Sequence, residues 1–302
     1  MPSRLLFDTS SLMYRAFFAL PPTIRDDTGR PVQAVHGYLE WTVRLMEQHR
    51  PASAVHVYDH DWRPAPRVAM YAGYKANRKA DPPDLPPQFD ILREVLDALG
   101  EPQAEAEGWE ADDAIGALCS GLPDDGSDRV DVVTGDRDLI QLVRDPVVRV
   151  LFTVRGVTQI AVFDEAGVEA KYGIPPSRYV DFAILRGDPS DGLPGVDGVG
   201  EKTARELVRG YPSLDELLAD ARDRRLTRGP AGRSPRLVAN LQAAEGYITT
   251  MRDIVPVRSD VPVHQWRGEP FDDDALDALA ERLSLRGPIR RHRRFARRAA
   301  QR

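Results

Sequence analysis

The sequence predicts an α/β fold, in which a parallel sheet with helices on both faces is followed by a mainly helical region. In the first half of the chain, short apolar segments that fit buried strands alternate with segments that have helical apolar spacing. From about residue 164 the pattern becomes mostly helical, with breaks at Pro and Gly. Because strands that alternate with helices usually form parallel sheets, both faces of this sheet should be covered.

Three of the predicted strands end in an aspartate, namely Asp8, Asp59 and Asp136. Since sites in open parallel sheets lie beyond the carboxyl ends of the strands, these three acids should gather at one edge. The expected strands are residues 4–8, 54–59 and 130–136, the expected helices are 34–49, 88–99 and 111–122, and a hairpin is expected at 147–162 with its turn at 155–156.

The chain is expected to have three parts. Its 302 residues are enough for two domains of ordinary size. We expect the sheet domain at residues 1–183, a helical domain at 184–285 and an Arg-rich tail at 286–302. Residues 61–87, which are rich in Pro, Arg, Lys and Tyr, form an insertion after the second strand, and connections of this length commonly have a function. For the tail, disorder and a short basic helix are both compatible with the composition.

Composition excludes several classes of protein. No apolar run approaches the roughly 20 residues that a membrane span needs, and the single Cys119 excludes an internal disulfide, so we expect a cytoplasmic protein. The net charge of −6 is unusual for a protein that binds nucleic acid. However, eight Arg residues and no acid lie in residues 286–302, and much of the acidity is in short clusters that metal ions could neutralise.

Nine acidic residues form a candidate metal site. Each acidic motif alone also fits a local role at a helix start or a turn, so the prediction depends on their joint occurrence. So many carboxylates at one sheet edge would repel each other unless cations neutralised them. Oxygen ligands without Cys or paired His favour Mg²⁺, or alternatively Mn²⁺, over Zn²⁺, and two such ions about 3.5–4 Å apart can hydrolyse a phosphodiester. The candidate ligands are Asp8, Asp59, Glu110, Asp112, Asp113, Asp136, Asp138, Asp188 and Asp191.

A Gly-rich turn follows the last two acids and opens a helix. Backbone N–H groups in such a turn can hold a phosphate, because Gly allows a close approach of the main chain. Lys202 adds a positive charge at the start of the helix. Metal chemistry and binding to a nucleic-acid backbone are therefore predicted side by side.

In this order, the motifs resemble the bacterial 5′-nuclease family, which comprises the 5′→3′ exonuclease domain of DNA polymerase I and stand-alone flap endonucleases. The resemblance runs from about Leu5 to about Leu285, and the absence of a polymerase region after it fits the stand-alone form. The motifs are Asp8, Tyr14-Arg15-Ala16-Phe17-Phe18, Asp59, Tyr74-Lys75-Ala76-Asn77-Arg78, Glu110-Ala111-Asp112-Asp113, Thr134-Gly135-Asp136-Arg137-Asp138-Leu139 and residues 187–203.

The resemblance implies a PIN-like sheet, a helical DNA-binding region that carries a helix-turn-helix hairpin, and two-metal hydrolysis of DNA where a 5′ single strand meets a duplex. The implied setting is replication or repair in the nucleoid, with RNA-primed DNA among the substrates and no small-molecule cofactor. It implies one metal at Glu110, Asp112, Asp113 and Asp136, a second at Asp138, Asp188 and Asp191, and a pocket completed by Asp8 and Asp59.

The resemblance also implies roles for residues outside the metal site. Lys75 and Arg78 would act in catalysis on the scissile phosphate, at the base of an arch formed by the insertion at 61–87. The hairpin at 196–203 would bind duplex backbone and K⁺ through its carbonyl groups. Tyr74 fits both base stacking and a place in the core. The residues implied in DNA binding are Arg15, Tyr74, Asn77, Gly198, Gly200, Lys202 and Thr203.

Two positions depart from the family pattern. Thr9 follows Asp8 where Gly is common, and Gly192 replaces the usual Asn after Asp191, which would loosen the second metal site. A ribonuclease of the PIN type and a non-catalytic protein that binds DNA junctions are the alternative functions. The Arg-rich tail fits both additional DNA affinity and a solvated terminus.

Overall fold

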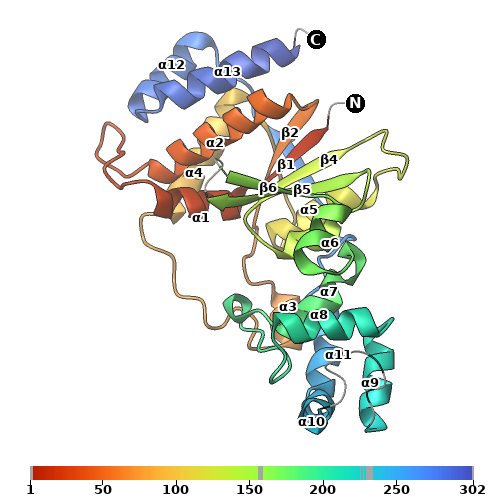
Figure 1. Ribbon diagram of the computed structural model, residues 1–302. Helices are drawn as coiled ribbons and strands as arrows, with labels where there is room; N and C mark the ends of the chain where they lie inside the picture. Colours follow the sequence, from red (N-terminus) through yellow and green to blue (C-terminus); the bar gives the residue numbers. More distant parts are fainter. Residues whose placement is uncertain (1–2, 156–158, 225, 227, 229–233, 301–302) are drawn as a thin grey trace.

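The computed structural model describes residues 3–155, 159–224, 226, 228 and 234–300, and it confirms the α/β fold (Figure 1). In this part of the chain, seven strands form one sheet in the order β6-β5-β4-β1-β2-β3-β7. The central strands pair in parallel, whereas β6 and β7 at the two edges run antiparallel to their neighbours. The strands are β1 (Arg4–Asp8), β2 (Ser53–Tyr58), β3 (Pro102–Glu105), β4 (Val130–Thr134), β5 (Val148–Arg155), β6 (Gln159–Phe163) and β7 (His264–Arg267).

Side-chain alternation along β1 separates two cores. Leu5 and Phe7 pack on one face with residues of α1 (Thr9–Ala19), α2 (Gln33–His49), α4 (Pro86–Leu99), α12 (Asp273–Arg282) and α13 (Arg286–Ala300). Leu6 packs on the opposite face with residues of α5 (Ala111–Ser120) and α7 (Tyr179–Arg186). The expected helices and strands around this sheet are present within a few residues of the predicted bounds, and the expected turn at 155–156 reaches outside the described residues. The helices of the sheet region are α1 (Thr9–Ala19), α2 (Gln33–His49), α4 (Pro86–Leu99), α5 (Ala111–Ser120), η1 (Asp138–Leu142) and α6 (Glu165–Tyr172). Helix α3 (Ala65–Met70), in the insertion, contacts α11 (Glu245–Ile254) below the sheet (Figure 1).

A second group of helices lies below the sheet in Figure 1. Helix α8 packs against α7 after a Gly-rich turn, and the apolar face of α8 is formed by Ala204, Leu207 and Val208. The boundary expected at residue 183 falls inside α7, whose residues Phe182 to Leu185 are part of a continuous core. The elements are η2 (Pro176–Arg178), α7 (Tyr179–Arg186), η3 (Pro189–Asp191), α8 (Glu201–Gly210), α9 (Leu214–Arg222), α10 (Pro235–Ala243) and α11 (Glu245–Ile254).

The chain then returns to the sheet, which differs from the expected helical domain at 184–285. Strand β7 pairs with β3, and α12 (Asp273–Arg282) and α13 (Arg286–Ala300) pack beside α2 and α4 (Figure 1). Hydrophobic burial explains the return, because Leu276, Leu279 and Ile289 are at most 5% exposed in the same core as β1.

The Arg-rich segment forms a docked helix, so disorder is wrong for its described residues. Arg291 donates to Glu40 and Glu47 on α2 at 2.6 Å each, and Arg293 and Arg297 contact Asp273 on α12. These acids neutralise much of the positive charge of the Arg-rich segment, and the neutralised part is not available to bind DNA. No helix of the described residues is long and apolar enough to cross a membrane.

Candidate functional site

The carboxylates at the ends of the strands are held by local hydrogen bonds. Asp8 caps α1, with its Oδ1 accepting from the backbone N–H of Ser11 at 3.1 Å. Its Oδ2 accepts from the Thr134 hydroxyl at 2.6 Å, which ties β1 to β4. Asp59 accepts from the N–H of Ala111 at 2.7 Å, at the start of α5. Three separate segments are thereby fixed at the carboxyl edge of the sheet, as predicted.

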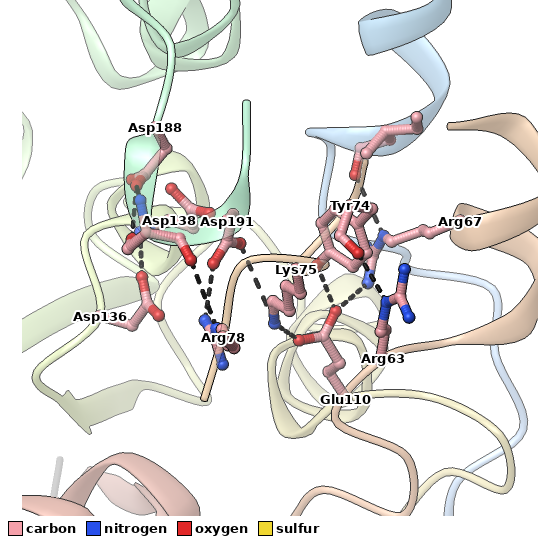
Figure 2. A network of polar contacts seen from close by, with 12 residues as sticks. Arg63, Arg67, Tyr74, Lys75, Arg78, Glu110, Asp136, Asp138, Asp188 and Asp191 are labelled. Carbon is pink, nitrogen blue, oxygen red and sulfur yellow. Dashed lines mark hydrogen bonds and ion pairs between the residues drawn. The ribbon is translucent and has the colours of Figure 1, made fainter. Parts of the chain in front are cut away.

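Two cations from the insertion lie among these acids (Figure 2). Lys75 is 5% exposed, and its ammonium contacts Glu110 and lies 3.9 Å from Oδ2 of Asp191. Its backbone is in the left-handed region, with φ at +52°, and its N–H donates to the carbonyl of Asp191 at 2.8 Å. Arg78 donates to Oδ1 of Asp191 at 2.6 Å. The insertion therefore delivers both predicted catalytic cations to the acidic cluster.

The acids that follow β4 and α7 complete the cluster. Oδ1 of Asp136 accepts from the N–H of Asp138 at 2.9 Å, and Oδ1 of Asp188 accepts from the N–H of Ser190 at 2.9 Å (Figure 2). Asp191 is 7% exposed at the end of η3. Thus the structure brings together residues that are more than 180 positions apart in the sequence.

Asp113 is the exception among the predicted ligands. Both of its oxygens accept from the buried guanidinium of Arg67 at 2.7 Å, and Oδ1 also accepts from the N–H of Arg258 at 2.9 Å. Asp112 instead lies near Asp136 and Asp8, and burial together with these two charges raises its pKa. Helix geometry explains the difference, because neighbouring residues in the first turn of α5 point in directions about 100° apart. Asp113 therefore forms a structural ion pair, and the geometry does not support it as a metal ligand.

Tyr74 belongs to the core. It is 5% exposed, and its hydroxyl donates to Oε2 of Glu110 at 2.5 Å. The Arg67 guanidinium lies 5.7 Å from the ring centroid, so a cation already covers this ring. Of the two interpretations of Tyr74, the structure supports the core residue and leaves no ring face for a base.

Burial and mutual repulsion disfavour ionisation of the cluster. Burial raises the pKa of Asp8 to about 7, and the charge of Asp59 adds to this rise, while the hydrogen bond from Thr134 opposes it. Burial and the charge of Asp136 raise the pKa values of Asp112 and Asp138 well above the usual range. Burial also raises the pKa of Asp136. A cation in the cluster would offset this excess negative charge.

The donor set fits a hard divalent cation such as Mg²⁺, because the ligands available are carboxylate oxygens. Within the described residues, no three His, Cys, Asp or Glu side chains already surround one point as metal ligands do. Lys75 and Arg78 now contact Glu110 and Asp191, so these two cations occupy part of the space that a metal would share. Binding would require a small rearrangement of these side chains.

The acidic cluster lies at one end of a cleft of about 1300 Å³. The cleft continues past α1 and the insertion to aromatic residues that sequence reasoning did not select, namely Trp41, Trp62 and Phe89. Trp62 lies in the Pro-rich insertion and is 47% exposed. Because Trp is usually buried to a large extent, its place in such a segment is a sequence signal that could have identified it. Arg67 was also missed, because its role depends on a contact with a helix 46 residues later.

The remaining predicted DNA-binding residues lie in two places. Arg15 donates to the carbonyl of Gly135 at 2.9 Å near the cleft, and Asn77 donates to the carbonyl of Pro189 at 2.7 Å. Gly198, Gly200, Lys202 and Thr203 form the turn and the first residues of α8, where Gly198 has φ of +71° and Lys202 is exposed.

The two departures from the family pattern have structural reasons. Gly192 has φ of +72°, and a Cβ atom there would lie 2.3 Å from the carbonyl oxygen of Gly73. Glycine is therefore needed for the close approach of the insertion to η3. Thr9 is fully buried, and its hydroxyl lies 3.0 Å from that of Tyr38.

Comparison with known proteins agrees with a chain in which a sheet domain is followed by a mainly helical region. Residues 3–173 match the family model of the 5′-3′ exonuclease N-terminal resolvase-like domain, and residues 174–273 match the model of its C-terminal SAM fold. A 5′-3′ exonuclease of Streptomyces coelicolor is 41% identical over 303 residues, with 95% of this chain and 98% of that protein covered. A DNA polymerase I of Mycobacterium bovis is 39% identical over 94% of this chain and 31% of its own length.

The fold is shared with solved nuclease structures. The T5 5′-exonuclease with bound zinc ions superposes with a TM-score of 0.66 over 98% of this chain and 99% of that chain, at 16% identity. The two family models together cover most of the chain, and the relative from Streptomyces matches it almost from end to end. The chain therefore belongs to the 5′-3′ exonuclease family, whose structural neighbours include flap endonucleases.

Proposed function

We propose that this protein is a structure-selective 5′→3′ exonuclease and 5′-flap endonuclease that hydrolyses DNA with two divalent ions in replication or repair. The observation that carries the proposal is the convergence of acids from five separate segments, together with Lys75 and Arg78, at one end of a large cleft. The raised pKa values of these acids support cation binding, since a cation lowers the cost of ionising them.

In this proposal, one ion would be held by Glu110, Asp112 and Asp136 and the second by Asp138, Asp188 and Asp191, while Asp8 and Asp59 would complete the pocket. Asp113 is left out because it is paired with Arg67. Mg²⁺ bound there would lower the pKa of a coordinated water and stabilise the leaving oxygen of a phosphodiester. The division of ligands between two ions follows the family resemblance.

Lys75 and Arg78 would orient the scissile phosphate. Lys75 now contacts Glu110, so neutralising Glu110 by a bound cation would free the ammonium to contact a phosphate oxygen. Arg78 can present two N–H groups to one phosphate, which fixes the orientation of the phosphodiester. The strained backbone of Lys75 is consistent with a position that is held for function.

The hairpin around α8 would bind the duplex part of the substrate. Exposed Gly198 and Gly200 let the main chain approach a phosphate, Lys202 adds charge, and carbonyl groups in 196–203 would bind K⁺. Such contacts read the shape of the backbone and not the base sequence. We therefore expect a preference for DNA with a 5′ single strand next to a duplex, including RNA-primed DNA.

The proposal is tested by comparing cleavage with binding in two variants. Asp136→Ala and Lys75→Ala are incubated with a labelled 5′-flap duplex in Mg²⁺, and the affinity is measured in EDTA. We expect cleavage to fall about a hundredfold or more in both variants, because metal-ion and phosphate contacts contribute several kcal/mol to catalysis. Affinity should stay within about threefold of the wild type. Equal losses of affinity and cleavage would contradict the proposal and indicate a structural role.

A further inference from the structure

Buried polar side chains connect the C-terminal helix α13 with the first residue of α1. The members Thr9, Tyr38, His56 and His292 are completely buried, and Glu101 is 7% exposed. They come from α1, α2, β2, the α4–β3 connection and α13. None of these side chains has a role in the proposed chemistry. Buried polar groups of this kind destabilise a fold unless their hydrogen bonds are satisfied.

The contacts of His292 join α13 to Glu101. Its Nε2 lies 3.0 Å from the carbonyl oxygen of Leu39, which only accepts, so Nε2 carries a proton. Its Nδ1 lies 3.3 Å from Oε1 of Glu101. The nearby Thr42 hydroxyl donates to the carbonyl of Tyr38 at 2.9 Å and can accept from Nε2. His292 therefore ties α13 both to α2 and to Glu101.

The next contacts continue from Glu101 to α1. Nε2 of His56 faces Oε2 of Glu101 at 3.7 Å, and its Nδ1 lies 2.6 Å from the Tyr38 hydroxyl. Burial lowers the pKa of His56, and at 3.7 Å its Nε2 is within reach of the Glu101 charge but makes no hydrogen bond to it. The Tyr38 hydroxyl also lies 3.0 Å from the Thr9 hydroxyl. Four successive contacts thus link His292 through Glu101, His56 and Tyr38 to Thr9.

The chain of contacts ends beside a candidate metal ligand. Thr9 is the first residue of α1 and follows Asp8, whose carboxylate caps the same helix through Ser11. We propose that His292 is a positioning residue for the nuclease site, since it fixes Glu101, and Glu101 orients His56 and Tyr38, which hold Thr9 and the start of α1 beside Asp8. This inference rests on the proposed function. It gives α13 a role at a site that none of its residues touch.

Two conservative variants test the connection. Tyr38→Phe removes only the hydroxyl between His56 and Thr9, and His292→Gln removes the imidazole ring and one of its two ring nitrogens while keeping an amide donor. Arg294→Ala is the matched control, because Arg294 is on the same helix, is 59% exposed and lies 3.7 Å from Glu47. Metal-free proteins are compared by hydrogen exchange of residues 9–13, and the metal-loaded proteins by single-turnover cleavage of a 5′-flap duplex.

We expect faster exchange at the start of α1 in both variants and about fivefold slower cleavage, as for the loss of one buried hydrogen bond. The double variant should cleave no more slowly than the worse single variant, because both changes interrupt one chain of contacts. The control should match the wild type.

Unchanged exchange at residues 9–13 or additive losses of cleavage would overturn the inference. If the wild type itself failed to cleave, the proposed function would be wrong, whereas the exchange measurement would still decide the connection between α13 and α1. The free energy of unfolding, measured with urea, separates a loss of fold from a loss of position in each variant.

Discussion

Adjacent acids at the start of α5 should have opposite roles, and this can be tested with two isosteric substitutions. Asp113→Asn removes a buried charge that is paired with Arg67, whose guanidinium is 5% exposed and also contacts Glu110. Asp112→Asn removes a charge that is repelled by Asp136 and Asp8. The two changes alter the same number of atoms and the same net charge, so each is the control for the other.

The structure gives a magnitude for each change. Breaking a buried ion pair by neutralising one partner costs about 3–5 kcal/mol, and the remaining contact of Arg67 with Glu110 should keep the loss near the lower value. We therefore expect Asp113→Asn to lose about 3 kcal/mol of unfolding free energy and to keep cleavage per folded molecule within about threefold of the wild type. Asp112→Asn should be at least as stable as the wild type without metal, because a repulsion is removed.

The assays are urea denaturation in EDTA and single-turnover cleavage of a 5′-flap duplex in Mg²⁺. Asp112→Asn should cleave about a hundredfold more slowly or worse, as expected for the loss of a metal contact worth several kcal/mol. A loss of cleavage in Asp113→Asn that exceeds its loss of folded protein would refute the separation of roles. So would a stability of Asp113→Asn equal to that of the wild type.

Three further predictions follow from the site. In EDTA, the stability of the wild type relative to Asp112→Asn should fall as the pH rises from 5 to 8. Burial and the charge of Asp136 raise the pKa of Asp112 in the folded protein, so its ionisation disfavours the fold, whereas Asn cannot ionise; a rising difference in thermal denaturation would contradict this. Gly192→Asn should destabilise the fold by about 1–3 kcal/mol in urea, since its Cβ meets the Gly73 carbonyl, and a stable, more active variant would show that the insertion adapts. Lys202→Ala should weaken duplex binding and reduce the slope of log affinity against log salt by about 1, and an unchanged slope would exclude a phosphate contact.

Much of the acidic carboxyl edge of the sheet could be predicted, because the local sequence determines it. An aspartate at the end of a buried strand lies at the carboxyl edge of a parallel sheet whatever the rest of the chain does, which placed Asp8, Asp59 and Asp136 correctly. Likewise, the positive φ of Gly198 follows from a Gly-rich turn before a helix.

The rest depends on contacts between distant segments. The side chain of Asp113 looks like that of Asp112 in the sequence, and only Arg67 and the backbone of Arg258 distinguish them. The docking of α13 could not be read from its composition, because Arg suits both solvent and the acids of α2 and α12. Burial of Tyr74 was undecided for the same reason, since the covering guanidinium comes from another helix.

The most direct test of the central claim is to map the cuts on a 5′-flap duplex that is labelled at either end, in EDTA, Mg²⁺ or Mn²⁺, with Asp136→Ala in parallel. Cuts that depend on the metal, cluster where the single strand meets the duplex and disappear in the variant are the predicted result. Binding to the flap without cleavage in either metal, or cuts that persist in Asp136→Ala, would contradict the assignment of the acidic cluster as the catalytic site.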